Sequence, residues 1–209
     1  MSDPTGDTHH ALDGRAAAES YDELPYPSHA LPRAHADRMA ALAWLHGVDV
    51  GETPAHRVLE IGASDAGHSA WVAASLPHAE VVAFDVSPRQ VETGVELARR
   101  AGLGNLSVRC LDALSLPDDL GAFDTIGCHG VFSWIPAPVR AAILATFGRL
   151  LPPHGVGYVS FNVLPGWYGR LALRDVLLRR TAHVRGAAAR AAAARAVLEQ
   201  LVRAIPPGQ

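Results

Sequence analysis

The strongest indication of the fold is the stretch Arg57-Val-Leu-Glu-Ile-Gly-Ala-Ser-Asp-Ala-Gly67. Its first half, Val58 to Ile61, is an apolar run typical of a buried strand, and small residues follow it. A helix is expected to begin near His68, and a second apolar strand, Val81-Val-Ala-Phe-Asp85, ends in an acid. A strand, a turn of small residues, a helix and a strand ending in a carboxylate are typical of a nucleotide-binding crevice, in which the acid holds a ribose diol.

Glu60 indicates which nucleotide the crevice takes. A dinucleotide sets its pyrophosphate on the helix N-terminus, where a nearby carboxylate would repel it. S-adenosylmethionine has no phosphate and carries a cationic amino group and sulfonium, so an acid at the end of the first strand suits it. The turn from Gly62 to Gly67 also lacks the middle glycine of the dinucleotide motif. The sequence therefore favours S-adenosylmethionine over a nicotinamide cofactor, and a nicotinamide-dependent oxidoreductase is the weaker alternative.

Strand and helix patterns alternate along the chain, with strands expected at 58–61, 80–85, 106–110, 123–128 and 156–162. This alternation predicts an α/β fold: a doubly wound, mostly parallel, Rossmann-like sheet with helices on both faces. From residue 169 onward only helical patterns are found. We expect a flexible N-terminus over 1–20, a cofactor-binding core over 21–168 and a helical extension over 169–209.

Bulk composition excludes several classes of partner. The 209 residues are 49% hydrophobic, enough for a core, and the net charge of −3 gives no support to nucleic-acid binding. The polar N-terminus has no secretory signal and no apolar run is long enough to cross a bilayer, so a cytoplasmic protein without membrane contact is expected. The histidines and the two cysteines lack ligand spacing, and we predict no metal.

Four segments resemble class I S-adenosylmethionine-dependent methyltransferases, and more narrowly the bacterial subgroup that carries a methyltransferase regulatory domain after the catalytic core. They are Tyr21-Asp-Glu-Leu-Pro-Tyr-Pro, Val58-Leu-Glu-Ile-Gly, Phe123-Asp-Thr-Ile-Gly-Cys-His-Gly-Val-Phe-Ser-Trp and Tyr158-Val-Ser-Phe-Asn-Val-Leu-Pro-Gly-Trp167. The resemblance covers about residues 21–180 and implies methyl transfer from S-adenosylmethionine. Members of the subgroup include protein lysine methyltransferases, and the acceptor here, a protein side chain or a small metabolite, stays open.

The resemblance also implies which residues bind the cofactor. Its methionine half would be held by residues of the first strand end and the turn: Glu60, Gly62, Ala63, Ser64 and Gly67. Asp85 would hold the ribose hydroxyls. Val86 would pack on the adenine ring, and Asp112, with Ala113 beside it, would bond the adenine amino group.

On the acceptor side, the resemblance places His129 at the end of the fourth strand, close to the reactive methyl. His129 is our candidate catalytic base because its ordinary pKa lies near neutral pH, and lining the pocket is its alternative role. Tyr21, Tyr26 and Trp134 would wall the substrate side. No Asn-Pro-Pro-Tyr element follows the fourth strand, which disfavours a nucleic-acid amino methyltransferase.

The sequence departs from the family pattern in two ways. Ser64 and Ala66 replace two glycines of the family loop, where a side chain costs affinity if the backbone needs a positive φ. The two strands that usually close this sheet, and the regulatory domain, are not found, which predicts the front part of a longer protein or a shortened relative. A degenerate methyltransferase fold that binds or regulates without turnover is the alternative function. An uncovered sheet edge would also favour a homo-oligomer.

Overall fold

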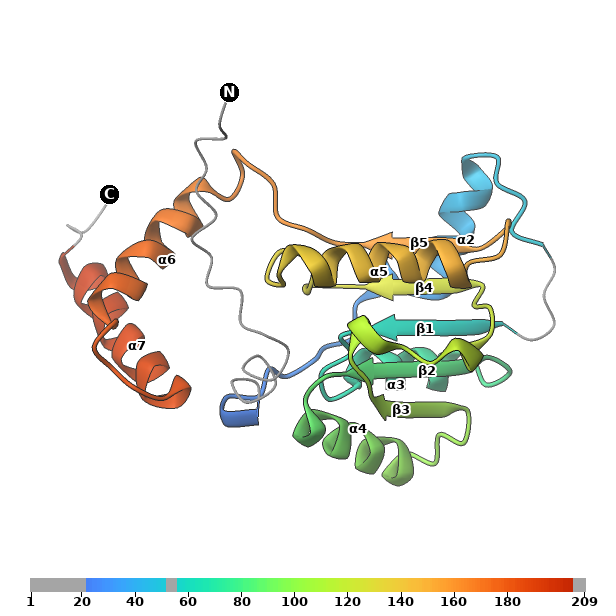
Figure 1. The fold of residues 1–209 in the computed structure, drawn as a ribbon, viewed down its shortest axis with the longest axis horizontal. Coiled ribbons are helices and arrows are strands. Elements are labelled where there is room, and N and C mark those ends of the chain that lie inside the picture. Colours follow the sequence, from blue (N-terminus) through green and yellow to red (C-terminus); the bar gives the residue numbers. More distant parts are fainter. Residues whose placement is uncertain (1–21, 52–55, 205–209) are drawn as a thin grey trace.

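The fold is a parallel sheet covered by helices, seen in a computed structural model that describes residues 22–51 and 56–204. The described residues form a five-stranded sheet in the order β3-β2-β1-β4-β5 (Figure 1). The strands are β1 (Arg57–Ile61), β2 (Glu80–Asp85), β3 (Leu106–Cys110), β4 (Thr125–Cys128) and β5 (Val156–Val159). Neighbouring strands are parallel throughout. The strand order reverses between β1 and β4, which is where ligands bind in sheets of this type.

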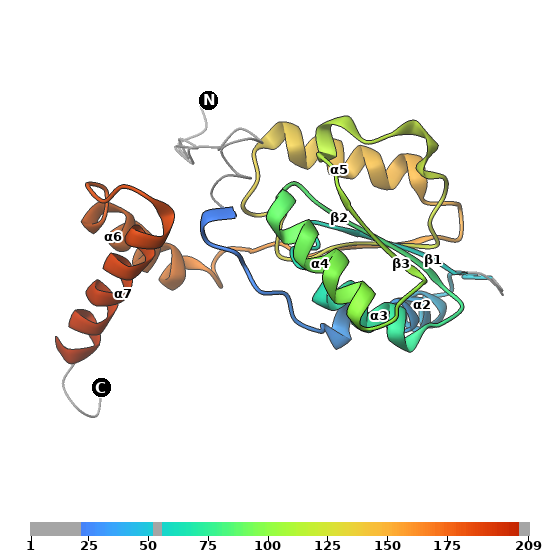
Figure 2. The same cartoon turned by 90° about the horizontal axis from the view of Figure 1, so that it is seen from below.

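Helices cover both faces of the sheet, as Figure 2 shows from the side. On one face lie α2 (Ala36–Leu45), α3 (Gly67–Ser75) and α4 (Pro88–Arg100), and on the other lies α5 (Ala137–Leu150). Alternate residues of one strand serve the two faces, because strand side chains point to opposite sides in turn. Leu59 packs in the cluster that contains Ile143 of α5, whereas Val58 packs in the cluster that contains Val72 of α3. Both faces are therefore apolar, and the α/β fold expected from the sequence is confirmed.

The start of α4 shows how the sequence sets a helix boundary. Ser87 is the N-cap, and its hydroxyl accepts a hydrogen bond from the backbone N–H of Gln90 at 3.1 Å. Pro88 occupies the first turn, where its missing N–H costs nothing. The helix therefore begins where the Ser-Pro pair predicts.

Two further helices follow the sheet, α6 (Tyr168–Arg180) and α7 (Ala187–Ala204). They pack on each other and lie to one side of the sheet (Figure 1). One tie to the rest of the chain is the carboxylate of Glu23, which accepts a hydrogen bond from the backbone N–H of Ala188 at 3.2 Å. The extension expected after residue 168 is helical, whereas its standing as a separate domain stays a prediction.

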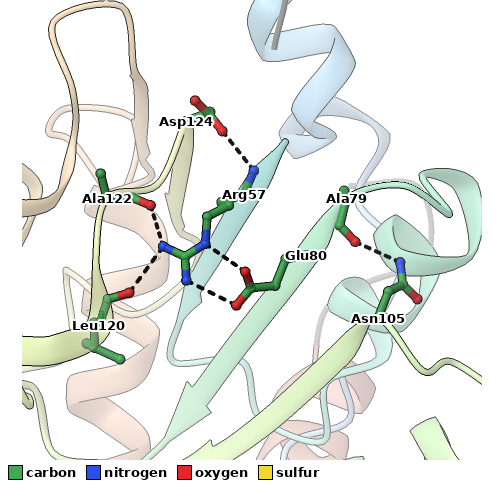
Figure 3. Close-up of polar contacts among 7 residues, drawn as sticks. All are labelled: Arg57, Ala79, Glu80, Asn105, Leu120, Ala122 and Asp124. Atoms are coloured by element: carbon green, nitrogen blue, oxygen red, sulfur yellow. Dashed lines mark hydrogen bonds and ion pairs between the residues drawn. The ribbon is translucent and has the colours of Figure 1, made fainter. Parts of the chain in front are cut away.

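The amino ends of the strands are held by a polar network around Arg57 (Figure 3). Its guanidinium donates to both carboxylate oxygens of Glu80, at 2.8 and 3.0 Å, and to the backbone carbonyls of Leu120 and Ala122. Its backbone N–H donates to the Asp124 carboxylate at 2.8 Å. These bonds join β1 to β2 and to the chain entering β4. They leave the carboxyl ends of the strands free for a site.

No helix within residues 22–51 and 56–204 is long and apolar enough to cross a lipid bilayer.

Candidate active site

The candidate site lies at the carboxyl ends of β1, β2 and β4. The loop that leaves β1, residues 62–66, runs into α3, and the residue that ends β2 is Asp85. His129 follows β4 directly. Because parallel strands all end at the same edge of a sheet, these residues are brought to one place from positions far apart in the sequence.

The loop after β1 has the backbone shape of a glycine-rich turn although it has fewer glycines. Gly62 has a φ of +72°, and a Cβ built there would lie 2.4 Å from Cγ2 of Val131. Ser64 and Ala66 also adopt the left-handed region, with φ of 54° and 57°. The replacement of two family glycines by Ser64 and Ala66 therefore leaves the backbone shape of the turn unchanged. The backbone at Ser64 and Ala66 is strained instead, because the left-handed region is disfavoured for residues with a Cβ.

The other small residues of the loop are needed for packing. Ala63 is buried in a cluster with Ala66 and Ala83 of β2. Gly67 begins α3, and a Cβ there would lie 2.5 Å from Oγ of Ser28. Small side chains therefore let the loop lie close to β2 and to the chain before α2.

Asp85 is tied to this loop by its carboxylate. One oxygen accepts a hydrogen bond from the backbone N–H of Ser64 at 2.8 Å, and the other accepts from that of Ser87 at 3.0 Å. Burial raises the pKa of the Asp85 carboxyl, and the three backbone donors around it, including Val86, oppose that rise. Each carboxylate oxygen can accept more than one hydrogen bond, so Asp85 keeps acceptor capacity for a ligand diol.

Glu60 is buried beneath the loop, on the face of the sheet that α3 covers. Its carboxylate accepts a hydrogen bond from the hydroxyl of Ser69. Burial raises the pKa of Glu60 to about 7. The side chain borders a small cavity of about 20 Å³, room for one water molecule, together with His68, His129 and Tyr158. A cation bound beside Glu60 would favour the charged form of its carboxyl.

The ends of β2 and β3 supply the remaining cofactor residues expected from the sequence. Val86 and Ala113 are half-buried. Asp112 is the N-cap of a short 3-10 turn, Ala113–Ser115, and its carboxylate accepts a hydrogen bond from the backbone N–H of Leu114 at 2.9 Å. The three residues stand at the same sheet edge as Asp85, because β2 and β3 pair in parallel up to Asp85 and Cys110.

His129 is paired with Tyr158 of β5. Nδ1 of His129 lies 3.0 Å from the Tyr158 hydroxyl, and the two rings are stacked with centroids 5.8 Å apart. Partial burial, with Arg33 nearby, lowers the pKa of His129. The imidazole is therefore neutral at pH 7, and the bond at Nδ1 leaves Nε2 as its free nitrogen.

Two of the three aromatic residues expected to line the substrate side lie within the described part of the chain. Tyr21 lies outside the described residues. The Tyr26 side chain is 67% exposed, and this residue contacts the loop through its backbone carbonyl. Trp134 is 48% exposed and packs edge-on against Trp167, with ring centroids 5.7 Å apart. Their part in binding an acceptor stays a prediction.

Sequence reasoning missed several residues that build the site: Ser28, Asp65, His68, Ser69 and Tyr158. Ser28 donates a hydrogen bond to Asp65 of the loop and accepts one from Gly67, and Tyr158 contacts His129. Tyr158 stands in a segment that carried the family resemblance, which is a signal that could have found it. The other missed residues make contacts that span more than thirty residues of sequence, or contacts between residue types that occur at no fixed spacing. Among residues 22–51 and 56–204, no three histidine, cysteine or acidic side chains gather where they could hold a metal ion.

This architecture, with a left-handed turn after β1 and an acid ending β2, defines the Rossmann-like class of nucleotide-binding domains. Residues 58–155 match the methyltransferase domain family. The solved structure of PKMT2 from Rickettsia typhi in complex with AdoHcy is similar, with a TM-score of 0.76 and 26% identity over 88% of this chain. This part of the chain thus contains a class I, S-adenosylmethionine-dependent methyltransferase domain, which confirms the resemblance to that class, whereas the narrower bacterial subgroup stays a prediction.

Relatives of known sequence are longer than this chain. Two uncharacterized proteins of Rickettsia prowazekii are 33% and 30% identical to it, over 86% and 76% of its length. The chain spans 32% and 64% of those relatives and 36% of PKMT2.

Proposed function

We propose that this chain binds S-adenosylmethionine at the carboxyl ends of β1 and β2 and transfers its methyl group to an acceptor at the end of β4. The observation that carries the proposal is the left-handed loop bonded to Asp85 through the N–H of Ser64 at 2.8 Å. The similarity to an AdoHcy complex supports it. The donor set also fits the cofactor, since its carboxylates can accept hydrogen bonds from hydroxyl and ammonium groups.

Each part of the proposed cofactor site has its own residues. The methionine half is held by Glu60, Gly62, Ala63, Ser64 and Gly67. Asp85 accepts hydrogen bonds from the ribose hydroxyls. The adenine is bound by Val86, Asp112 and Ala113.

When bound, S-adenosylmethionine supplies a methyl group already activated by its sulfonium. The protein therefore has to align the acceptor, exclude water and, for some acceptors, remove a proton. His129 is proposed as the base, acting through Nε2. Tyr158 supports that role from the other side of the ring, because its hydroxyl oxygen can accept the Nδ1–H of an imidazolium.

The acceptor is proposed to be either a protein side chain or a small metabolite. The exposed Tyr26 and Trp134 leave the entrance open to both. Methyl-labelled S-adenosylmethionine, incubated with the chain and a cell extract, would separate the two, by label in precipitated protein or in the small-molecule fraction. We expect label in one of these two fractions, and we expect the Asp85→Ala control to show no such label.

A second candidate function is binding without turnover. It is favoured by the strained Ser64 and Ala66, and by β5, which has a strand neighbour on one side only in the described sheet. Cofactor binding with no label transferred to either fraction would support it. The outer edge of β5, which pairs with no strand in the described sheet, is also the basis for proposing a homo-oligomer, which light scattering would detect.

A further inference from the structure

The segment Asp22–Ser28, here called the clasp, is held against both the loop after β1 and the start of α4. At its first residue, the Asp22 carboxylate accepts a hydrogen bond from the Ser87 hydroxyl. The guanidinium of Arg89 donates to the Asp22 carbonyl at 2.7 Å. The clasp therefore begins at the helix that follows Asp85, the proposed ribose-binding acid.

The middle of the clasp is held by a single carbonyl. The backbone oxygen of Tyr26 accepts hydrogen bonds from the hydroxyl of Ser64 and from the side-chain amide of Gln90, the latter at 3.1 Å. Gln90 is 3% exposed, so its amide is fixed in the interior of the fold. Ser64 is one of the two residues that stand where the family has glycine. Its side chain thus bonds the clasp directly.

The last residue of the clasp completes the attachment. The N–H of Ser28 donates to the Asp65 carboxylate at 3.1 Å, and the Ser28 hydroxyl bonds the same carboxylate. That hydroxyl also accepts from the N–H of Gly67, at 2.5 Å, in the first turn of α3. Three residues of the loop region, Ser64, Asp65 and Gly67, are therefore bonded to a segment that lies about forty residues earlier in the chain.

From these contacts we infer that the clasp is a working part of the cofactor site, and that Ser64 and Gln90 are positioning residues that act on the cofactor through the Tyr26 carbonyl. A glycine at position 64 would adopt the left-handed backbone freely but could not hold the clasp. Ser64 keeps the same backbone and adds the bond. The inference rests on the proposed function, because it concerns how the loop is held for S-adenosylmethionine.

The test compares variants that release the clasp from opposite sides. Ser64→Gly removes the hydroxyl and relieves the left-handed strain, and Gln90→Met removes the amide while keeping the side chain's length. Thr146→Val is the control, since it removes a buried hydroxyl whose hydrogen bond to the Ala142 carbonyl lies within α5, on the other face of the sheet. The readouts are calorimetric affinity for S-adenosylhomocysteine and hydrogen exchange of the peptide containing Ser28.

The expected result is roughly tenfold weaker binding and faster exchange in both clasp variants, with Ser64→Gly no less stable than wild type. Thr146→Val should bind within about threefold of wild type. Wild-type affinity in both Ser64→Gly and Gln90→Met, whatever their exchange rates, would overturn the inference and leave the proposed function standing. A folded wild-type chain that binds no cofactor would overturn both.

Discussion

At the scale of single residues, the loop after β1 shows two ways in which the chain meets a positive φ. Gly62 does so without strain, whereas Ser64 and Ala66 do so with a Cβ, at roughly 1–2 kcal/mol each. The bonds of Ser64 to the Asp85 carboxylate and to the Tyr26 carbonyl offset that cost at its position. The strain is therefore held by the surrounding contacts, which is common at binding sites.

Gly62→Ala is expected to disrupt the loop by close contact as well as by strain. Its new Cβ would lie 2.4 Å from Val131, and the backbone φ is +72°. Gly130→Ala is the matched control, because Gly130 has a φ of +71° and open space around it. We expect losses in unfolding free energy of about 1 kcal/mol for Gly130→Ala and about 2–4 kcal/mol for Gly62→Ala, measured by urea denaturation. Equal losses would mean that Val131 moves aside freely.

Tyr158→Phe is expected to lower the pKa of His129 further. The Tyr158 oxygen stabilises the protonated imidazole by accepting its Nδ1–H at 3.0 Å, and phenylalanine cannot do this. NMR titration of the His129 ring would measure the change, with His129→Gln used to assign the signal. Tyr168→Phe, at a 61% exposed ring, is the control. An unchanged or higher His129 pKa in Tyr158→Phe would contradict a hydrogen bond in which the Tyr158 oxygen accepts the Nδ1–H of the imidazolium.

Glu60 gives the free protein a specific pH dependence. Burial raises its pKa from 4.5 to about 7, so the folded state holds the proton more tightly than the unfolded state does. The stability that the neutral carboxyl contributes is thus fully present below pH 4.5 and is lost as the pH rises through about 7.

Cofactor binding should therefore release a proton from Glu60 at pH 6, because the ligand's ammonium group favours the carboxylate. Calorimetry of S-adenosylhomocysteine in two buffers with different ionisation enthalpies measures this release. Glu60→Gln, which cannot ionise, should show less of it. The same release in Glu60→Gln would mean that the proton comes from another group.

At the scale of elements, the two ends of the sheet have separate tasks. The carboxyl ends of β1 and β2 carry the site, and their amino ends carry the Arg57 network. Arg57 bonds Glu80 with two contacts, and its guanidinium stacks 4.4 Å from the centroid of the Phe123 ring. The Arg57 network therefore lies at the end of the sheet opposite the candidate site.

Arg57→Met should lower the unfolding free energy by about 1–3 kcal/mol, because two backbone carbonyls and Glu80 lose their donor. Cofactor affinity should not change. Arg99→Met is the control, since Arg99 pairs with Glu96 at the surface, where solvent screens the pair, and its loss should cost less than that of Arg57. Denaturation and calorimetry on both variants check this. Weaker cofactor binding in Arg57→Met would show that the two ends are coupled.

The sequence was informative about elements and less so about what joins them. The apolar run at 58–61 and the terminal Asp85 of the second strand each have a local cause, and each led to a correct element. The contacts of Ser28 with Asp65 and of His129 with Tyr158 span 37 and 29 residues, and no local pattern encodes them. The left-handed φ of Ser64 was likewise a question that only the fold could answer.

At the scale of the whole molecule, the described chain is a nucleotide-binding sheet with a helical pair beside it. The clasp touches both, because Asp22 bonds the start of α4 and the adjacent Glu23 bonds the start of α7. These two acids stand at helix N-termini, where negative charge is favourable. The position of α6 and α7 is therefore linked to the same segment that holds the cofactor loop.

We propose that the loop after β1 and Asp85 bind the cofactor despite the side chains of Ser64 and Ala66. Calorimetric titration of the purified chain with S-adenosylhomocysteine measures this binding, with Asp85→Ala as the control. We expect micromolar binding by the wild-type chain and a loss of at least tenfold in Asp85→Ala. No binding by a folded wild-type chain, or equal binding by the two proteins, would contradict it.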